Sequence, residues 1–338
     1  MTGWDLLALR QSLAENLSIF EPAAPPSQSI RTLSILLFAI AALIFVVVEG
    51  ILVYNLLRFR KTADGPSTEP PQVYGGTPIE IAWTVAPTLI VSILVLVLAR
   101  TLWEIDLDPP PPKPGDNALF VTVVGRQWWW EYRYDKYNGR DVGFITANEL
   151  HVPAGNDGVP RRVYLDLQSA DVIHSFWVPR LAGKTDLIPG KTNRMWFETR
   201  EQGTFYGQCA EYCGTQHAGM LLRVVVDSPE DFAHWIELQQ RPARDEPAAR
   251  QGKAAFLAES CVNCHRIRGT SAAGTYAPDL THLMSRETLA SGLVPNNQNN
   301  LDRWVKNPQQ LKLGCLMPAF SFSDRRREEI VRYLATLH

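Results

Sequence analysis

The sequence predicts a multidomain protein in which a two-helix transmembrane hairpin precedes an all-β sandwich and an all-α domain. Three observations lead to this fold class: two long apolar segments near the N-terminus, short alternating segments in the middle, and helical spacing near the C-terminus. The chain has 338 residues and a net charge of −2, and it is longer than one typical domain. Its mean hydropathy of −0.12 resembles that of a soluble protein, because the average hides the apolar segments. The small net charge excludes a protein that binds nucleic acid through a strongly basic surface.

Two segments, residues 32–57 and 81–99, are apolar enough to cross a bilayer. The first contains one charge, Glu49, and the second contains none. As helices they would span roughly 39 Å and roughly 29 Å, at about 1.5 Å per residue. Buried core helices are the alternative, but core helices are rarely apolar on every face. We therefore place the transmembrane hairpin at 31–105, after an N-terminal arm at 1–30.

Basic residues beside the first apolar segment predict the orientation of the hairpin. Arg58, Arg60 and Lys61 come directly after that segment, and basic residues favour the cytoplasmic side of a membrane. The loop between the two helices is therefore expected in the cytoplasm, with both termini and the later domains outside it. The run DPPPPKPG at 108–115 cannot continue a helix and separates the hairpin from the later domains.

The middle of the chain, residues 116–240, has the pattern of an antiparallel β-sandwich. Short alternating segments bounded by Gly, Pro or Asn are typical of such strands, and they are ALFVTVV, RVYLDLQ, RMWFET and MLLRVVV. A short helix is expected at 229–240. The charged, proline-bearing residues 240–249 are predicted to be a linker that permits several docking poses. Residues 250–338 form the all-α domain, whose last helix begins after Ser323 as its N-cap.

The segment CAEYCGTQHAGM at 209–220 carries the strongest chemical signal. It contains two thiols, an imidazole and a thioether, from Cys209, Cys213, His217 and Met220. These soft ligands suit copper better than magnesium or calcium, whereas zinc sites seldom use a thioether and usually pair their cysteines with a distant second pair. His174 is the best candidate for a second imidazole, since it follows a strand-like run and precedes a turn. A disulfide between the two cysteines is the alternative.

The pentapeptide CVNCH at 261–265 matches the attachment pattern of a c-type haem. Cys261 and Cys264 would bond the haem covalently, and His265 would ligate its iron. Met317, in a loop before the last helix, would be the second axial ligand, a pairing that raises the reduction potential. Met284, expected in a helix, is the rival ligand. A redox or zinc-binding pair of cysteines is the alternative interpretation of the pentapeptide.

Residues 30–240 resemble subunit II of the haem–copper cytochrome c oxidases. The motifs that carry the resemblance stand in the family's order, and they are the two membrane helices, GRQWWWEYRY, DVIHSFWVP, KTDLIPG and CAEYCGTQHAGM. The resemblance implies a cupredoxin-like sandwich that holds the dinuclear copper centre CuA. The implied ligands are His174, Cys209, Cys213, His217, Met220 and the backbone carbonyl of Glu211. It also implies that the Glu211 side chain contacts a magnesium ion shared with the catalytic subunit.

Two further residues take their roles from this resemblance. Trp128 matches the exposed ring at which electrons reach CuA, although core packing is the alternative for aromatic residues of this strand. Alternation puts four of them on one face, namely Trp128, Trp130, Tyr132 and Tyr134. Glu80 matches the family's proton-uptake glutamate at the cytoplasmic end of the second helix, a place where glutamate is otherwise common.

From about residue 249 the chain resembles a class I cytochrome c, with Pro278 on the histidine side of the haem. The combination resembles oxidases whose subunit II carries a fused cytochrome c. It implies a bacterial plasma-membrane electron-transfer subunit that accepts electrons from a cytochrome c or an upstream complex. They would pass through haem c and CuA to subunit I, which reduces oxygen to water and pumps protons. The implied partners are subunit I, subunit III and the lipid bilayer.

Three other functions compete with this interpretation. The chain would alternatively deliver electrons to another terminal reductase such as a nitric oxide reductase, belong to a quinol oxidase with a metal-free sandwich, or serve as a disulfide-bonded anchor. The intact soft-ligand motif argues against the second. Cys315 is the odd cysteine among five, and we expect it to be a small buried residue near the haem.

Overall fold

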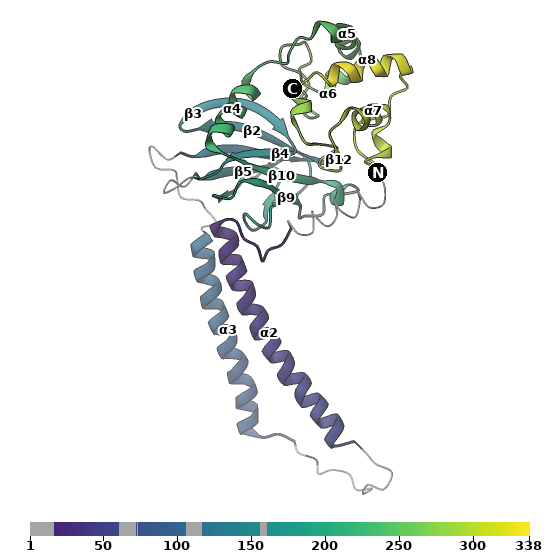
Figure 1. The fold of residues 1–338 in the computed structure, drawn as a ribbon. Coiled ribbons are helices and arrows are strands. Elements are labelled where there is room, and N and C mark those ends of the chain that lie inside the picture. Colours follow the sequence, from purple (N-terminus) through teal and green to yellow (C-terminus); the bar gives the residue numbers. More distant parts are fainter. Residues whose placement is uncertain (1–16, 61–71, 73, 106–116, 156–160) are drawn as a thin grey trace. The chain divides into compact units, whose positions relative to one another are not determined.

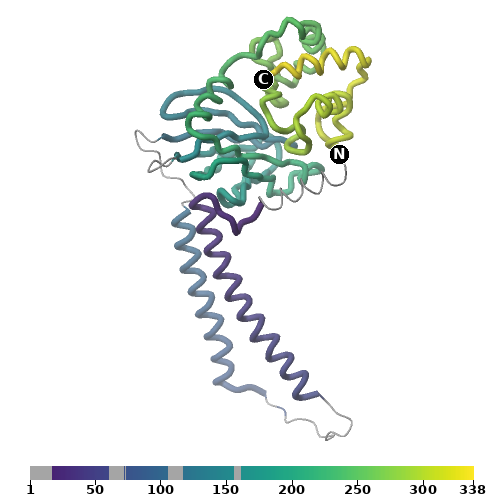
Figure 2. Tube along the Cα trace, in the orientation of Figure 1, coloured from purple at the N-terminus to yellow at the C-terminus, as the bar shows by residue number. Residues whose placement is uncertain are grey.

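The protein is described here from a computed structural model, in which residues 17–60, 72, 74–105, 117–155 and 161–338 are described. The chain divides into two compact units (Figures 1 and 2). One contains Gln28–Asp106, and the other contains Met1–Ser27 together with Leu107–His338. Part of the predicted N-terminal arm, Lys61 of the predicted cytoplasmic loop and the proline run at 108–115 lie outside the described residues.

The first unit contains two long apolar helices, α2 (Pro25–Arg58) and α3 (Thr77–Ile105). Both are long and apolar enough to cross a membrane, and their most apolar windows are 0% buried. That exposure excludes the alternative of helices inside a soluble core, because a core helix would bury these side chains. Pro87 lies within α3, as bilayer helices tolerate. The helices include the predicted segments and extend beyond them at both ends.

The second unit contains a sandwich of two five-stranded sheets. The first sheet has the order β3-β2-β1-β5-β8, with β1 (Leu119–Arg126), β2 (Trp129–Tyr137), β3 (Arg140–Ala147), β5 (Val163–Ser169) and β8 (Asn193–Phe197). The second has the order β4-β10-β9-β6-β7, with β4 (Glu149–Pro153), β6 (His174–Trp177), β7 (Thr185–Leu187), β9 (Gly203–Cys209) and β10 (Leu221–Asp227). The four segments expected to be strands are confirmed as β1, β5, β8 and β10.

The strand pairing departs from the antiparallel expectation at two places. The pairs β1–β5 and β4–β10 are parallel, whereas the other pairs within both sheets are antiparallel. Each parallel pair arises because the chain crosses to the other sheet before it returns beside the earlier strand. The composition of a segment indicates that it is a strand. It does not indicate which sheet the next strand joins, and therefore whether a pair is parallel, because this depends on contacts distant in the sequence.

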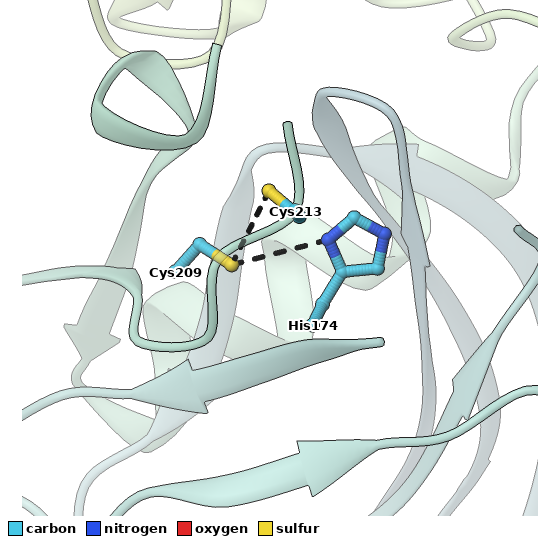
Figure 3. Close-up of side chains that lie close together, drawn as sticks. All are labelled: His174, Cys209 and Cys213. Carbon is cyan, nitrogen blue, oxygen red and sulfur yellow. Dashed lines mark hydrogen bonds between the residues drawn. The ribbon is translucent and has the colours of Figure 1, made fainter. Parts of the chain in front are cut away.

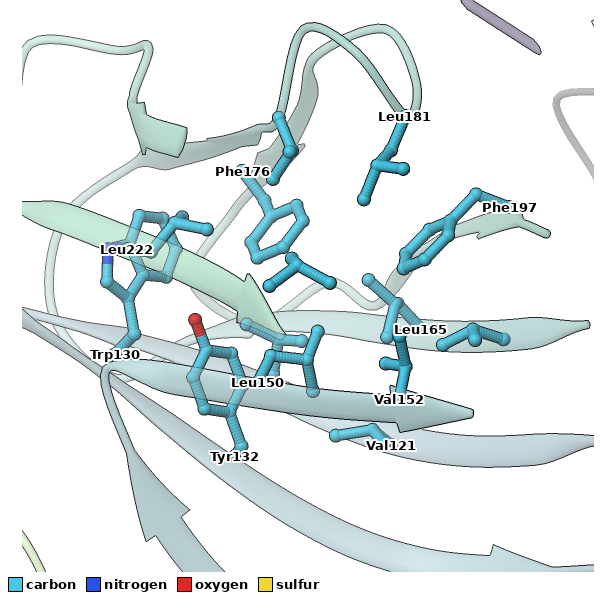
Figure 4. Close-up of a cluster of buried hydrophobic side chains, with 14 of the residues drawn as sticks. Val121, Trp130, Tyr132, Leu150, Val152, Leu165, Phe176, Leu181, Phe197 and Leu222 are labelled. Carbon is cyan, nitrogen blue, oxygen red and sulfur yellow. The ribbon is translucent and has the colours of Figure 1, made fainter. Parts of the chain in front are cut away.

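Apolar side chains from both sheets fill the space between them (Figure 4). The four aromatic residues expected on one face, Trp128, Trp130, Tyr132 and Tyr134, all lie in this core, although Trp128 precedes β2 and Glu131 within the strand is also buried. Helix α4 (Pro229–Gln240) has the bounds that the sequence predicts, and it begins where the Ser228 side chain accepts a hydrogen bond from the backbone of Asp231. Such an N-cap satisfies one of the backbone donors that a helix start leaves unpaired.

The C-terminal region is helical, as predicted. Its helices are α5 (Arg250–Ala258), α6 (Cys261–Cys264), α7 (Gln298–Lys306) and α8 (Asp324–Leu334), with a small ribbon of β11 (Thr288–Leu289) and β12 (Val294–Pro295). Ser323 caps α8 by accepting a hydrogen bond from the backbone N–H of Arg326. Met284, expected in a helix, lies instead in the three-residue 3₁₀ turn η3 (Leu283–Ser285). Its main-chain N–H is bound by the carbonyl of Leu337, which holds the segment against the end of the chain.

The substitution Gly252→Ala is expected to destabilise the helical region. A Cβ atom at Gly252 would lie 2.0 Å from the carbonyl oxygen of Glu329 in α8, so α5 and α8 would have to move apart. Overpacking of this kind costs about 1–3 kcal/mol. Thermal unfolding of the purified chain should show this loss, whereas Gln251→Ala at the exposed neighbouring position should leave stability nearly unchanged. Equal stability of the two variants would contradict the packing argument.

Candidate metal and haem sites

The fold brings five predicted ligand side chains together at one end of the sandwich. His174 begins β6, rather than following a strand as expected, and Cys209 ends β9. Cys213, His217 and Met220 come from the loop between β9 and β10, which includes the 3₁₀ turn η1 (His217–Gly219). His174, Cys209 and Cys213 point toward one another (Figure 3), and their ligand atoms all lie within 4.8 Å of one another.

The distances within this cluster suit a pair of metal ions. The two sulfur atoms, Cys209 Sγ and Cys213 Sγ, lie 3.7 Å apart. Cys209 Sγ lies 3.9 Å from His174 Nδ1, and Cys213 Sγ lies 3.7 Å from His217 Nδ1 and 3.8 Å from Met220 Sδ. Ligands bonded to one metal at about 2.0–2.3 Å are separated by distances of this size. Each sulfur also has its own imidazole, so the residues present would supply ligands for two metal ions.

The alternative of a disulfide between Cys209 and Cys213 is wrong for this structure. Both cysteines are free and buried, and their sulfurs lie 3.7 Å apart, whereas a disulfide bond measures about 2.0 Å. Hydrogen bonding to Cys213 lowers the pKa of the Cys209 thiol to about 3, and the same pairing raises the pKa of Cys213. Two thiols this close disfavour two negative charges, and a metal that binds them would displace their protons.

His174 is held in its orientation by Asp171, a residue outside the predicted ligand set. The ring nitrogen Nε2 lies 2.7 Å from Asp171 Oδ1, so Nδ1 is the nitrogen that faces Cys209. Burial raises the pKa of Asp171, but hydrogen bonds from His174 and from the backbone of Gln127 and Val172 outweigh burial and lower its pKa overall. A ligand histidine commonly binds a carboxylate in this way, and the contact fixes the ring and its tautomer.

Gly125 provides the space that the His174 ring occupies. A Cβ atom at this position would lie 2.7 Å from His174 Cδ2, closer than real side chains approach. The glycine stands in the motif GRQWWWEYRY, but nothing in the sequence alone connects it with a histidine 49 positions later. The close approach makes Gly125 part of the site although it offers no ligand atom.

In the C-terminal region, the haem attachment motif forms a short helix whose last turn leads into His265. Cys261 and Cys264 are half-buried and free, and the ring nitrogen Nδ1 of His265 lies 2.7 Å from the carbonyl oxygen of Pro278. This bond occupies Nδ1, so Nε2 is the ring nitrogen that would be available to ligate a haem iron. Burial lowers the pKa of His265, which favours the neutral imidazole that binds metals. The residues present therefore fit a covalent haem with a histidine ligand.

The segment that carries Met317 is organised by Gln309. The amide nitrogen of Gln309 donates to the carbonyl oxygens of Cys315 at 2.9 Å and Met317 at 3.0 Å, and its oxygen accepts from the backbone of Gly314 at 2.7 Å. Cys315, expected to be buried, is only half-buried, and its sulfur lies 3.3 Å from the same amide nitrogen. The rival ligand Met284 packs instead against the apolar core of the helical region.

Comparison with known proteins matches three parts of the chain in order. The family model "Cytochrome C oxidase subunit II, transmembrane domain" matches residues 12–99, the model for the periplasmic domain matches 119–228, and the model "Cytochrome c" matches 249–338. Cytochrome c oxidase subunit 2 of Alkalihalophilus pseudofirmus is 36% identical over 96% of this chain and 91% of its own length. The chain belongs to the cytochrome c oxidase subunit 2 family.

The chain is also similar to a second curated relative and to one solved domain. Cytochrome c oxidase subunit 2 of Bacillus subtilis is 32% identical over 95% of this chain and 92% of its own length. The solved periplasmic domain of cytochrome oxidase subunit II from Bradyrhizobium japonicum is 32% identical over 38% of this chain and 96% of that chain, with a TM-score of 0.33. Proteins of this family belong to an oxidoreductase complex with a haem–copper catalytic subunit, and a subunit II that carries a cytochrome c domain has an electron-transfer role. The two apolar helices and the periplasmic-domain match fit a membrane protein.

The position of Trp128 differs from the exposed ring expected for this family. Its side chain is 9% exposed, and the indole N–H donates to the carbonyl oxygen of Cys213 at 3.0 Å. The amide of Gln127 donates to the same oxygen at 2.8 Å. The expectation of exposure is therefore wrong, because the ring lies against the ligand loop and its surroundings cover it. Its contact with a ligand residue remains.

The two glutamates with roles implied by resemblance lie in different units. Glu211 has an exposed side chain, and its carbonyl oxygen lies 3.2 Å from Cys209 Sγ, so its carbonyl is at the ligand cluster while its side chain is at the surface. Glu80 lies in the first turn of α3, where its carboxylate accepts a hydrogen bond from the backbone N–H of Gly76 at 3.2 Å. A carboxylate at a helix start is stabilised there.

We expect Asp171→Asn to weaken copper binding by about 10–100-fold. The amide has one acceptor oxygen in place of two, so it cannot accept from both His174 and the backbone of Gln127 as the carboxylate does. Competition with a copper chelator measures the affinity of the purified chain. The control is Asp141→Asn, because the Asp141 side chain is 86% exposed and lies 3.9 Å from Lys136. Unchanged affinity in both variants would contradict the orienting role of Asp171.

Gln309→Ala is expected to lower the reduction potential of the haem. The substitution removes the hydrogen bonds that hold the carbonyls of Cys315 and Met317. The methionine segment would then loosen, and the ligation expected of Met317, which would raise the potential, would weaken. A redox titration followed by haem absorbance gives the potential. Gln310→Ala, at the exposed neighbouring position, should leave the potential unchanged. A wild-type potential in the Gln309 variant would argue against this support of Met317.

Proposed function

We propose that this chain is the electron-transfer subunit of a membrane haem–copper terminal oxidase and holds both a dinuclear CuA centre and a covalent haem c. The copper ligands are His174, Cys209, Cys213, His217, Met220 and the carbonyl of Glu211. The haem is held by Cys261, Cys264, His265 and Met317. The observation that carries the proposal is the buried pair of sulfurs 3.7 Å apart, each with an imidazole nitrogen within 3.9 Å.

The two groups supply one-electron redox chemistry when they are bound. The chain's own residues keep their ligand atoms fixed, so that little rearrangement accompanies a change of charge. Four of the copper ligands are at most 3% exposed, namely His174, Cys209, Cys213 and Met220. Asp171 fixes the His174 ring. A rigid and water-poor ligand set is what rapid electron transfer requires, because solvent reorganisation then contributes little to the barrier.

In this proposal the chain delivers electrons, and subunit I reduces oxygen. A cytochrome c or an upstream complex supplies them, and subunit I couples the reaction to proton pumping, with subunit III as a further partner. The family match, which names a cytochrome c oxidase subunit over both the helices and the sandwich, favours oxygen over nitric oxide as the final acceptor. Oxygen and nitric oxide consumption by membranes that contain the complex distinguishes the two.

The proposed orientation places the sandwich, the cytochrome c domain and both termini on the outer side of a bacterial plasma membrane. The basic residues Arg58, Arg60 and Lys61 support it, and so does the covalent attachment of haem c, which takes place outside the cytoplasm. Glu80 then lies at the cytoplasmic side, where it serves proton uptake. The exposed side chain of Glu211 contacts a magnesium ion at the boundary with subunit I.

Cys213→Ser should abolish electron delivery to subunit I, since it removes one bridging sulfur of the copper centre. The expected result is loss of the near-infrared copper absorption and of oxygen consumption in the reconstituted oxidase, with the c-type haem spectrum retained. Cys315→Ser is the matched control for the copper centre, because Cys315 lies outside the ligand cluster and its substitution should leave the near-infrared copper absorption unchanged. Wild-type oxygen consumption in the Cys213 variant would refute the copper assignment.

A further inference from the structure

One lysine of the cytochrome c domain is buried against the sandwich. Lys312 is 4% exposed, and its Nζ donates to the carbonyl oxygens of Trp128 at 2.7 Å, Gly219 at 2.8 Å and Ala290 at 3.1 Å. Two of these carbonyls belong to the copper-binding sandwich and one to the cytochrome c domain itself. The side chain therefore crosses from one domain into the other.

The contact uses the full hydrogen-bonding capacity of an ammonium group. A protonated lysine has three donors and a neutral one has two, and three carbonyl oxygens surround this nitrogen. Burial lowers the pKa of Lys312 to about 7, whereas the three acceptors favour the charged form. No ion pair with Lys312 occurs among the described residues, so carbonyl dipoles take the place of a carboxylate. A buried charge satisfied in this way tolerates little displacement, because each lost contact leaves a donor or acceptor unpaired.

The two sandwich carbonyls belong to the segments that shape the copper site. Trp128, whose carbonyl accepts from Lys312, donates its indole N–H to the carbonyl of Cys213. Gly219 lies in the same 3₁₀ turn as His217 and directly precedes Met220. The lysine side chain thus contacts two supports of the copper-ligand loop, the carbonyls of Trp128 and Gly219.

Lys312 also belongs to the segment that carries the predicted methionine ligand of the haem. Gln309, three positions earlier, holds the carbonyls of Cys315 and Met317, and the backbone N–H of Cys315 donates to the carbonyl of Lys312 at 3.1 Å. One short segment therefore reaches the haem ligand at its end and the copper loop through its lysine.

A second charge crosses the domain boundary in the opposite direction. Glu149 of the sandwich is 2% exposed, and its carboxylate accepts hydrogen bonds from the backbone of Glu287 and from the backbone and hydroxyl of Thr288. Beside it, Arg223 pairs with Glu287 at 2.5 Å. The two domains therefore exchange buried charges at separate points, which fixes their relative rotation as well as their contact.

The predicted linker is also held at its beginning. Arg268 of the cytochrome c domain donates to the carbonyls of Gln239 and Gln240 at the end of α4, and His282 Nε2 lies 3.0 Å from the carbonyl of Arg241. These contacts hold the beginning of the predicted linker against the cytochrome c domain, although the composition of residues 240–249 by itself permits several poses.

We propose that Lys312 is a positioning residue that fixes the cytochrome c domain on the copper-ligand loop for electron transfer between the two redox sites. The inference rests on the proposed function, which supplies both redox sites. A flexible tether alone would only raise the local concentration of the cytochrome c domain near the copper site. The Lys312 contact would in addition fix the orientation of the domain.

The test uses the complete oxidase with Lys312→Met and, as a matched control, Lys306→Met, since Lys306 is an exposed lysine of the same domain. A photosensitised flash injects one electron into haem c, and its passage to the copper centre is followed as haem oxidation with simultaneous copper reduction. In the Lys312 variant we expect transfer to slow by about tenfold or more, while the haem and copper spectra of the resting enzyme stay unchanged. The control should transfer electrons at the wild-type rate.

Hydrogen exchange in the same complexes gives a readout that does not depend on activity. Backbone amides at 217–221 and 288–293 should exchange about tenfold faster or more in Lys312→Met, and at the wild-type rate in Lys306→Met. If Lys312→Met disturbs either cofactor spectrum, Lys312→Gln, which keeps two donors, takes its place and should slow transfer by about threefold.

The outcomes separate this inference from the proposed function. Transfer in the wild type combined with an unchanged rate or unchanged exchange in the Lys312 variant would overturn the positioning role and leave the proposed function standing. If no electron passes from haem c to the copper centre in the wild type, the proposed function itself fails.

Discussion

The close approach of two sulfur atoms is the constraint on which the rest of the site depends. Cys209 and Cys213 lie 3.7 Å apart and each is 3% exposed, and the contact between the two thiols lowers the pKa of Cys209 and raises the pKa of Cys213. Two thiolates held this closely repel each other unless cations lie between them. Metal binding would therefore stabilise the conformation of the loop between β9 and β10. Without a metal, contacts with the surrounding sandwich have to hold that conformation.

The surrounding residues hold the candidate ligands in place by hydrogen bonds and by leaving space for them, and they do not add ligand atoms of their own. Asp171 orients the ring of His174, Gly125 leaves room for it, and Trp128 and Gln127 bind the carbonyl of Cys213. Each of these contacts acts on a ligand residue from outside the cluster. The positions of the candidate ligands are thus set by hydrogen bonds from residues between the strands and by the space at Gly125, and such contacts can make a site of loop residues rigid.

The parts of the fold that can be predicted well from the sequence are those with local causes. The apolar segments, the strand alternation of residues 130–134 and the start of α8 at Ser323 each depend on neighbouring residues. The ligand motif and CVNCH are also local. What the sequence could not reveal depends on distant partners: the parallel pairing of β1 with β5, and the burial of Trp128. The local sequence around a tryptophan is the same whether its indole is exposed or covered, because the residues that cover it come from elsewhere in the chain.

The same reasoning explains why the boundary between the two redox domains was invisible in the sequence. Lys312 and Glu149 are single charges in ordinary polar surroundings of the sequence, and nothing local marks either as buried. In the structure each charge is satisfied by polar groups of the other domain, the lysine by carbonyls and the glutamate by N–H and hydroxyl donors. Neither charge could be buried if the domains separated, and both would then return to water. When the domains dock, the water around each of the two charged groups is replaced by hydrogen bonds to fixed polar groups. Apolar contact is not directional. The two charged contacts therefore select one orientation more strongly than an apolar patch of equal size would.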